Sequence, residues 1–241
     1  MLKTGDRKAS SGRINRLLYK KMGRAINDYG MLSAGDKILI AVSGGLDSLA
    51  MLKLFEMRQK AIPVSFDAVA CFVDINFIKT NCARLCDFLD TCSFKYVKRE
   101  IKMEPGSGCF WCSWNKRKVL FETARQHGCN KIALGHNFDD MTETVLLNLF
   151  FRGEISSSPP SLSMFSGEIT LIRPMCYIEK EEVKEFASYW DLSSKAGRCP
   201  YENDNRRNSV REIIKGLEKD CPFVKKNIFR SLRRIKKDYL L

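Results

Sequence analysis

Continuous apolar runs alternate along the chain with longer stretches in which apolar residues recur every three or four positions. The runs are short and rich in β-branched side chains, which is typical of strands buried on both faces of a parallel sheet. We expect strands at residues 37–42, 67–75, 94–101, 130–135 and 168–174. The helical periodicity predicts helices at residues 11–30, 46–60, 79–91, 113–127, 140–151 and 179–190, with short basic helices beyond residue 197.

This alternation of strands and helices predicts an α/β fold, a parallel sheet with helices on both faces. We expect the chain to divide into three parts. Residues 1–30 would form a basic helical extension, residues 31–197 the α/β domain, and residues 198–241 a basic helical segment packed on the same domain.

Composition narrows the class of protein. Hydrophobic residues make up 44% and charged residues 29% of the chain, which is typical of a globular protein. No run of about 18 apolar residues occurs, so we expect no membrane partner. The first residues are basic and lack the apolar segment of a secretory signal, so we expect a cytoplasmic protein.

Positive charge is concentrated at the two ends of the chain. Residues 1–24 hold eight Lys and Arg and one acid, and residues 198–241 hold thirteen Lys and Arg and six acids. The stretch between them is nearly neutral, although the net charge of the whole chain is +13. Two solvated basic helices would give the same pattern, but charge of this size favours a surface that binds nucleic acid.

A glycine-containing turn follows the first strand and opens the next helix. Its sequence is Ser43-Gly44-Gly45-Leu46-Asp47-Ser48. Glycine lets a backbone approach a ligand closely, and a helix N-terminus attracts phosphate. The turn matches neither the Walker pattern nor the dinucleotide fingerprint. The alternative is a tight turn in which Asp47 or Ser48 only caps the helix.

A second polar segment stands at the end of the fourth strand, where ligands bind in sheets of this type. It contains Gly135 and His136 and then the adjacent carboxylates Asp139 and Asp140. Two neighbouring carboxylates could hold Mg²⁺ against bound phosphates. Asp140 followed three residues later by Glu143 also resembles a capping box.

Cys109 and Cys112 are spaced as a chelating pair, in a Gly- and Pro-containing loop before a helix. A redox dithiol, a structural zinc site and an iron–sulfur cluster all remain open. A structural zinc site requires four ligands, and the sequence has no second closely spaced cysteine pair to complete it. An iron–sulfur cluster with one iron not held by cysteine needs only one more thiolate, for which Cys199 is the natural candidate. Phe110 and Trp111, between the paired cysteines, could stack on an extruded base or pack in the core.

The other seven of the ten cysteines are expected to be buried thiols rather than parts of a disulfide framework.

The turn at Ser43–Ser48 resembles the SGGxDS loop of the PP-loop ATP pyrophosphatases, which cleave ATP between its α and β phosphates and adenylate a substrate oxygen. The segment from Gly135 to Thr144 resembles the GHxxDDxxET stretch shared by tRNA lysidine synthetases and tRNA 2-thiocytidine synthetases. The order of all these elements is similar to the tRNA 2-thiocytidine synthetase family over most of the chain. One departure is Leu46, where that family usually has lysine.

The resemblance implies an ATP-dependent tRNA sulfurtransferase that adenylates the C2 oxygen of a cytidine, position 32 of the anticodon loop, and replaces it with sulfur. It implies ATP, Mg²⁺ and a 4Fe–4S cluster, with tRNA and a cysteine desulfurase or other sulfide donor as partners, and leaves a homodimer open. It assigns catalysis to Asp47 and to the cluster ligands Cys109, Cys112 and Cys199. The nucleotide site would comprise Ser43, Gly44, Gly45, Asp47, Ser48, Gly135, His136, Asp139 and Asp140.

Three alternatives remain open from the sequence. The first is thiolation of a different tRNA base, such as a uridine. The second is a lysidine synthetase-like ligation, which needs no cluster and leaves the cysteine pair without a role. The third is a non-enzymatic RNA-binding metal protein with a decayed ATP loop, which only Leu46 supports.

Overall fold

A computed structural model gives the fold. It describes residues 4–61, 64–76, 78, 80–104, 108–194, 197 and 205–239, without the side chains at 4–11, 109, 205 and 237. The chain divides into two compact units, Met1–Asn137 with Pro160–Tyr201, and Phe138–Pro159 with Glu202–Leu241. Each unit is described here by itself. The units cut the chain at other places than residues 30/31 and 197/198, and those expected boundaries stay a proposal about which parts fold together.

The first unit is built on a six-stranded sheet of order β3-β2-β1-β4-β6-β5. All neighbouring strands are parallel except β5 and β6. Its strands are β1 Lys37–Val42, β2 Asp67–Ile75, β3 Lys95–Ile101, β4 Lys131–Ala133, β5 Ser161–Met164 and β6 Ile169–Ile172. The expected α/β class and the five expected strands are confirmed, and β5 is additional.

No strand was expected at β5, and its sequence explains why. It has only four residues, SLSM, and none of them is buried. It pairs antiparallel with β6 across a tight turn in which Phe165 and Ser166 both have positive φ, 53° and 54°. Backbone hydrogen bonds to β6 rather than an apolar pattern therefore define this edge strand.

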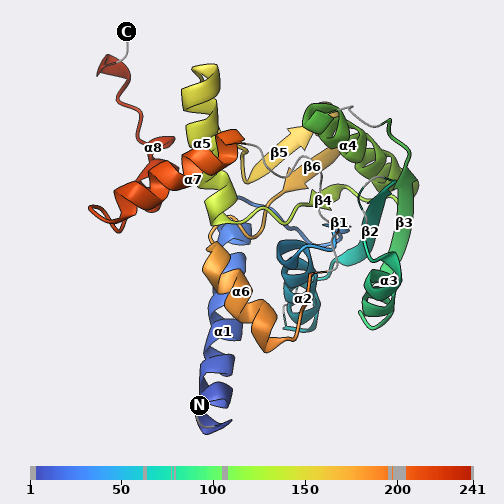
Figure 1. Cartoon of the computed structure of the whole chain (residues 1–241). Helices are drawn as coiled ribbons and strands as arrows, with labels where there is room; N and C mark the ends of the chain where they lie inside the picture. The colour runs from blue at the N-terminus through green and yellow to red at the C-terminus, as the bar shows by residue number, and fades with distance from the viewer. Residues whose placement is uncertain are drawn as a thin grey trace. The chain divides into compact units, whose positions relative to one another are not determined.

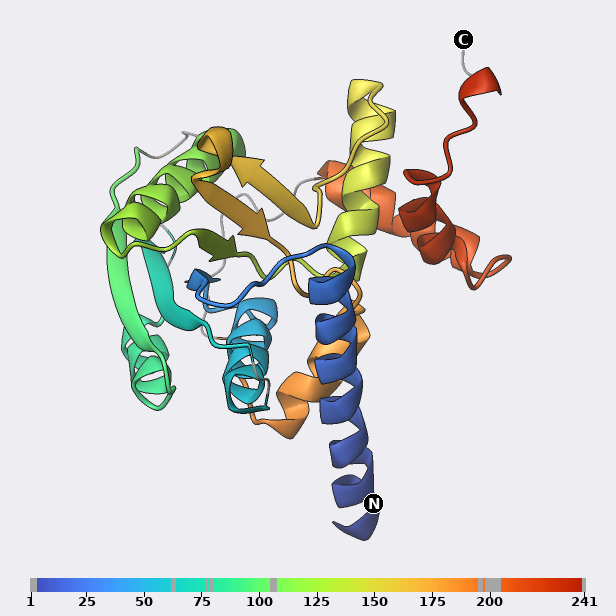
Figure 2. The same ribbon diagram turned by 180° about the vertical axis from the view of Figure 1, so that it is seen from behind.

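Helices cover both faces of the sheet, as expected (Figures 1 and 2). α4 (Gly108–Gln126) lies on one face, and α2 (Leu46–Ala61) and α3 (Cys82–Asp90) lie on the other. Such an arrangement follows from right-handed crossovers, because the chain turns back across the sheet between β3 and β4. α4 begins before the expected residue 113, so the cysteine pair lies in its first turns and not in a loop before it.

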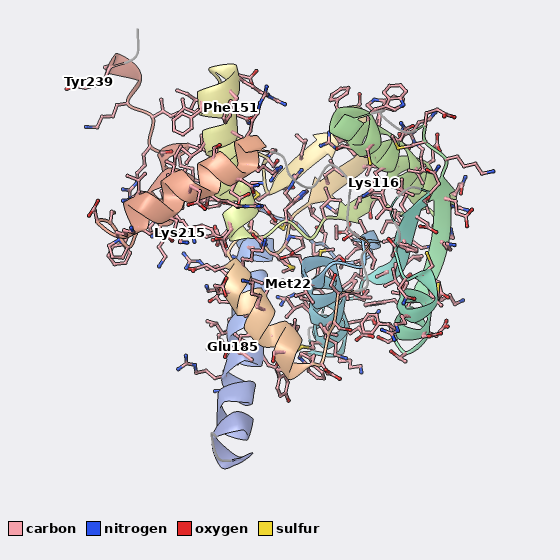
Figure 3. All side chains as sticks on the ribbon, in the orientation of Figure 1. Met22, Lys116, Phe151, Glu185, Lys215 and Tyr239 are labelled. Atoms are coloured by element: carbon pink, nitrogen blue, oxygen red, sulfur yellow. The ribbon has the colours of Figure 1, made fainter. Side chains whose placement is uncertain are left out.

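α1 (Thr4–Asp28) is part of the core of the first unit, where it packs against α2 and α6 (Lys180–Tyr189). Its side chains Ile14, Leu18 and Met22 are buried, and Figure 3 labels Met22. Burying each large apolar side chain contributes about 1.5–3 kcal/mol. The helix is therefore an integral element rather than a loose extension.

The second unit is helical, and the short basic helices expected beyond residue 197 belong to it. It contains α5 (Phe138–Arg152), α7 (Asn205–Glu218), α8 (Val224–Ser231) and a short 3₁₀ turn, Lys237–Tyr239. Leu146 of α5 packs with Val210 and Ile214 of α7. Within the described residues, no helix is both long and apolar enough to cross a membrane.

Candidate active site

The strand order puts a crevice at the carboxyl ends of β1 and β4. From β1 the chain passes outward to β2 and β3, then returns to place β4 on the other side of β1. Connections leaving two neighbouring strands in opposite directions open a binding crevice between them. The Ser43–Ser48 loop follows β1, and Gly135 and His136 follow β4. Both predicted segments therefore reach the same edge of the sheet.

The Ser43–Ser48 loop is held in shape by its own hydrogen bonds. The backbone N–H of Ser43 donates to Ser48 Oγ over 3.1 Å, and Ser48 Oγ donates to the carbonyl oxygen of Gly45 over 2.8 Å. Gly44 adopts φ 79°, a conformation that glycine reaches without strain. Ser48 thus joins the two ends of the loop, and α2 starts at its rim with free N–H groups suited to phosphate.

Asp47 is positioned by a residue to which the sequence assigned no role. Asn137 Nδ2 donates to Asp47 Oδ1 over 2.7 Å, and Asn137 is only 1% exposed. A buried amide bonded to a carboxylate fixes the carboxylate's orientation. The available signal was the placement of an amide directly after the fourth predicted strand.

Gly135 allows the loop after β4 to lie against the start of α2. A Cβ atom at this position would stand 3.2 Å from both Cα and N of Ser48, and 3.3 Å from the carbonyl carbon of Asp47. These neighbours are backbone atoms, which cannot swing away as a side chain does. Gly135 therefore brings the two halves of the predicted nucleotide site together.

A cavity of about 440 Å³ opens at this edge, within the size range of nucleotide and other small-molecule sites. Ser43, Asp47, Ser48, Gly135 and His136 line one part of it. β2 and α4 supply another part. From these two elements come Cys71, Val73, Cys112, Ser113, Lys116, Arg117 and Leu120. One cavity therefore connects the phosphate-type loop with Cys112, which the sequence alone could not establish.

The two cysteines of this cavity differ in character. Burial raises the pKa of the Cys71 thiol to about 11, so Cys71 keeps its proton at neutral pH, as expected of a buried structural thiol. Cys112 is only half-buried and stands in the first turns of α4, where its sulfur reaches the cavity. Its sulfur chemistry fits a cluster or metal ligand beside the loop. The side chain of Cys109 and the whole of Cys199 lie outside the described residues.

Burial was also expected of the remaining cysteines. Cys129 and Cys176 are buried, but the expectation is wrong for Cys82, Cys86, Cys92 and Cys221, which are only partly buried. Cys82 Sγ donates to Asp74 Oδ2 over 3.0 Å, and burial together with that carboxylate raises the pKa of Cys82 to about 11. Burial also raises the pKa of Cys92 to about 11. These thiols are protonated at neutral pH, which supports the structural interpretation of them.

Positive charge gathers at the His136 end of the cavity. Arg173, 6% exposed, donates from Nε to His136 Nδ1 over 3.3 Å. Burial and the nearby charge of Arg117 lower the pKa of Arg173 to about 10, so it is still cationic at neutral pH. Two arginines that repel each other favour an anion in their neighbourhood. Arg173 was not expected as a site residue, because it fell inside the last expected strand, whereas β6 ends at Ile172. Lys116 and Arg117 were not expected as site residues either.

Asp139 and Asp140 belong to the second unit, in the first turn of α5. Asp139 Oδ1 forms an ion pair with Lys225 Nζ at 3.0 Å. α5 begins at Phe138, so Asp140 is inside the helix and does not head a capping box. Glu143 is instead bound by Arg211, with Nε to Oε1 at 2.7 Å. A role for the two aspartates in binding Mg²⁺ stays a prediction.

Comparison with known proteins identifies the class. A family model described as a PP-loop domain matches residues 15–217, so the chain belongs to the PP-loop family. The tRNA-cytidine(32) 2-sulfurtransferase of Geobacter metallireducens is 35% identical over 238 residues, covering 94% of this chain and 92% of the relative. The protein of the same name from Geobacter sulfurreducens is 35% identical over 244 residues, covering 95% of each. Within the PP-loop family, the chain belongs with the tRNA-cytidine(32) 2-sulfurtransferases.

A solved structure supports the fold. The chain is similar to the U34-tRNA thiolase NcsA from Methanococcus maripaludis with its 4Fe–4S cluster, with TM-score 0.79 and 24% identity. The match covers 93% of this chain and 79% of that one. The arrangement of sheet and helices is therefore that of a known PP-loop protein.

Proposed function

We propose that this chain is an ATP-dependent tRNA sulfurtransferase that replaces the C2 oxygen of cytidine 32 in the anticodon loop with sulfur. The observation that carries the proposal is the single cavity lined both by the Ser43–Ser48 loop and by Cys112. A loop suited to phosphate and a cysteine suited to sulfur chemistry serve two successive half-reactions best when they share one space. Family membership supports the same activity.

In the first half-reaction the loop holds the phosphates of ATP. The C2 oxygen of the base attacks the α-phosphorus, a bond from that oxygen to phosphorus forms, and the bond to the β-phosphate oxygen breaks, releasing pyrophosphate. Cations stabilise the developing charge. Lys116 and Arg117 line the cavity, and Arg173 lies behind His136, so this chain supplies positive charge that Leu46 lacks.

Mg²⁺ would accompany the phosphates, held by carboxylates as hard cations require. Asp47, fixed by Asn137, is the first ligand we assign. The part predicted for Asp139 and Asp140 in binding Mg²⁺ stays a proposal about the second unit, in which Asp139 is paired with Lys225.

In the second half-reaction sulfur displaces the activated oxygen, and AMP leaves. Cys109, Cys112 and Cys199 would hold a 4Fe–4S cluster, and such a cluster would supply the sulfide that attacks the activated base. The apolar walls of the cavity, Val73 and Leu120, exclude water from the adenylated base. Sulfide would come from a cysteine desulfurase or another donor, and assembly as a homodimer stays a prediction.

The decisive experiment uses protein purified without oxygen, an unmodified tRNA transcript, ATP and sulfide. Nucleoside mass spectrometry should find 2-thiocytidine at position 32, only when ATP is present. If thiouridine is found instead, the enzyme acts on a different base of the tRNA. If active protein contains stoichiometric zinc and no iron, the cluster assignment is wrong and the cysteines bind a structural metal instead.

A further inference from the structure

Two tryptophans near the start of α4 form an exposed stacked pair. The rings of Trp111 and Trp114 are 5.1 Å apart between centroids and nearly parallel, with an interplanar angle of 7°. Their spacing of three residues puts them on one helical face. The side chains are 49% and 46% exposed, and the neighbouring Phe110 is 80% exposed. The alternative that Phe110 and Trp111 pack in the core is therefore wrong.

The pair leaves an aromatic surface open to a ligand. Each ring uses one face for its partner. Trp114 has Lys118 beside it, with Lys118 Nζ 5.8 Å from the centroid of the Trp114 ring. Trp111 lies closer to the start of the helix, next to Phe110 in the chain. Trp114 thus supports Trp111 from behind. A rigid, preoriented ring of this kind binds another flat ring with little loss of conformational freedom.

The surroundings indicate which flat ring this would be. Trp111 adjoins Cys112 in the chain, and Lys116 and Arg117 of the same helix line the cavity; Figure 3 labels Lys116 on α4. The stretch Lys116-Arg117-Lys118 carries three positive charges and no acid. Aromatic side chains interleaved with cations are the features that bind unpaired nucleotides, with bases on rings and phosphates on cations.

We propose that Trp111, supported by Trp114, stacks on an unpaired base that flanks the target nucleotide of the RNA substrate. This inference rests on the proposed function, because it takes the ligand to be tRNA. Trp111 is the contact residue and Trp114 a positioning residue. Lys118, which lies beside Trp114, would bind an adjoining phosphate.

The test measures binding of a synthetic RNA hairpin that carries the anticodon loop. The chain has three tryptophans, so intrinsic fluorescence reports on this pair and on Trp190 alone. Fluorescence should be quenched in step with binding followed independently by anisotropy of labelled RNA. Trp190→Phe should leave the quenching in place, because Trp190 is held by Asn15 in another part of the first unit.

Two double variants separate stacking from structure. Trp111→Leu with Trp114→Leu removes the flat rings and should weaken RNA binding about 10-fold or more, since one base on one ring contributes about 1–3 kcal/mol. Trp111→Phe with Trp114→Phe keeps flat rings and should recover most of the affinity. Both variants should unfold at the wild-type temperature, because the replaced side chains are exposed.

The outcomes for stacking and for the proposed function differ. If wild-type protein binds and thiolates the RNA but its fluorescence is unchanged, the stacking proposal is overturned while the function stands. Wild-type affinity in the leucine variant would overturn it too. If wild-type protein neither binds nor thiolates the RNA, the proposed function fails, and stacking fails with it. If the leucine variant does not fold, the fluorescence of wild type and of Trp190→Phe tests the proposal: quenching by RNA in both supports stacking, and its absence overturns it.

Discussion

The Ser43–Ser48 loop and the start of α4 line the same cavity but are built in opposite ways. The loop is folded on itself, with Ser48 bonding to both ends and Asp47 fixed by a buried asparagine. The start of α4 instead turns large aromatic rings outward, and the side chains of Arg117 and Lys118 are exposed to solvent. A site that must hold a small triphosphate is preorganised from within, whereas a site that must admit a large RNA leaves its contact groups exposed.

Removing the sulfur ligand at the start of α4 should have the largest effect. Cys112→Ala should reduce 2-thiocytidine to an undetectable level and lower the iron content of anaerobic protein, while ATP still binds to the intact loop. The matched control is Cys221→Ala, whose thiol lies in the second unit. Full activity of Cys112→Ala would take the start of α4 out of the sulfur chemistry.

Removing the carboxylate of the loop should come next. Asp47→Ala should lower kcat by on the order of 10²–10³, the loss usual for one preorganised electrostatic group. RNA affinity and iron content should be unchanged. Asn137→Ala should produce a smaller loss, and the double variant should be little worse than Asp47→Ala alone, since Asn137 acts through Asp47. Additive losses would show that the asparagine has a separate role.

The contact between the two halves of the nucleotide site can be broken by one methyl group. Gly135→Ala places a Cβ 3.2 Å from the backbone of Ser48, so the start of α2 must shift. A displacement of about 1 Å can cost about 10²-fold in rate, and ATP affinity should fall with it. Gly216→Ala on α7, where nothing stands within 4 Å of the new atom, is the control. Equal kinetics in both variants would contradict the close approach.

The smallest effect concerns Cys71, which lines the cavity but belongs to neither region. Because burial raises its pKa to about 11, the folded protein keeps a proton that the unfolded chain releases from about pH 8.5. The stabilisation is complete below that pH and is lost as pH rises to about 11, by about 3 kcal/mol. Urea unfolding at pH 7 and 10.5 should show this extra loss in wild type and not in Cys71→Ala. If wild type and Cys71→Ala lose the same amount of stability between the two pH values, burial does not raise the pKa of Cys71.

β1 and β2 were predictable to the residue, because β1 is an almost wholly apolar run and β2 is apolar between its two aspartates. β5 was not, since four mostly polar residues paired at a sheet edge leave no apolar pattern. The glycine loop and Gly135 with His136 were found from their places after strands. Lys116 and Arg117, which line the cavity, and Asn137 and Arg173, which contact residues that line it, were missed as site residues, because only tertiary packing brings them together.

The N-terminal helix α1 divides its two tasks between two faces. Ile14, Leu18, Met22 and Ala25 are buried, whereas Arg13, Arg16, Lys20 and Arg24 follow one another along the exposed face. Under the prediction that the basic ends of the chain bind nucleic acid, mutations on the basic face would raise or lower attraction to RNA over evolutionary time while folding stays intact. Mutations on the buried face are purged for their effect on stability alone. A single helix thus lets substrate affinity drift independently of the scaffold that it completes.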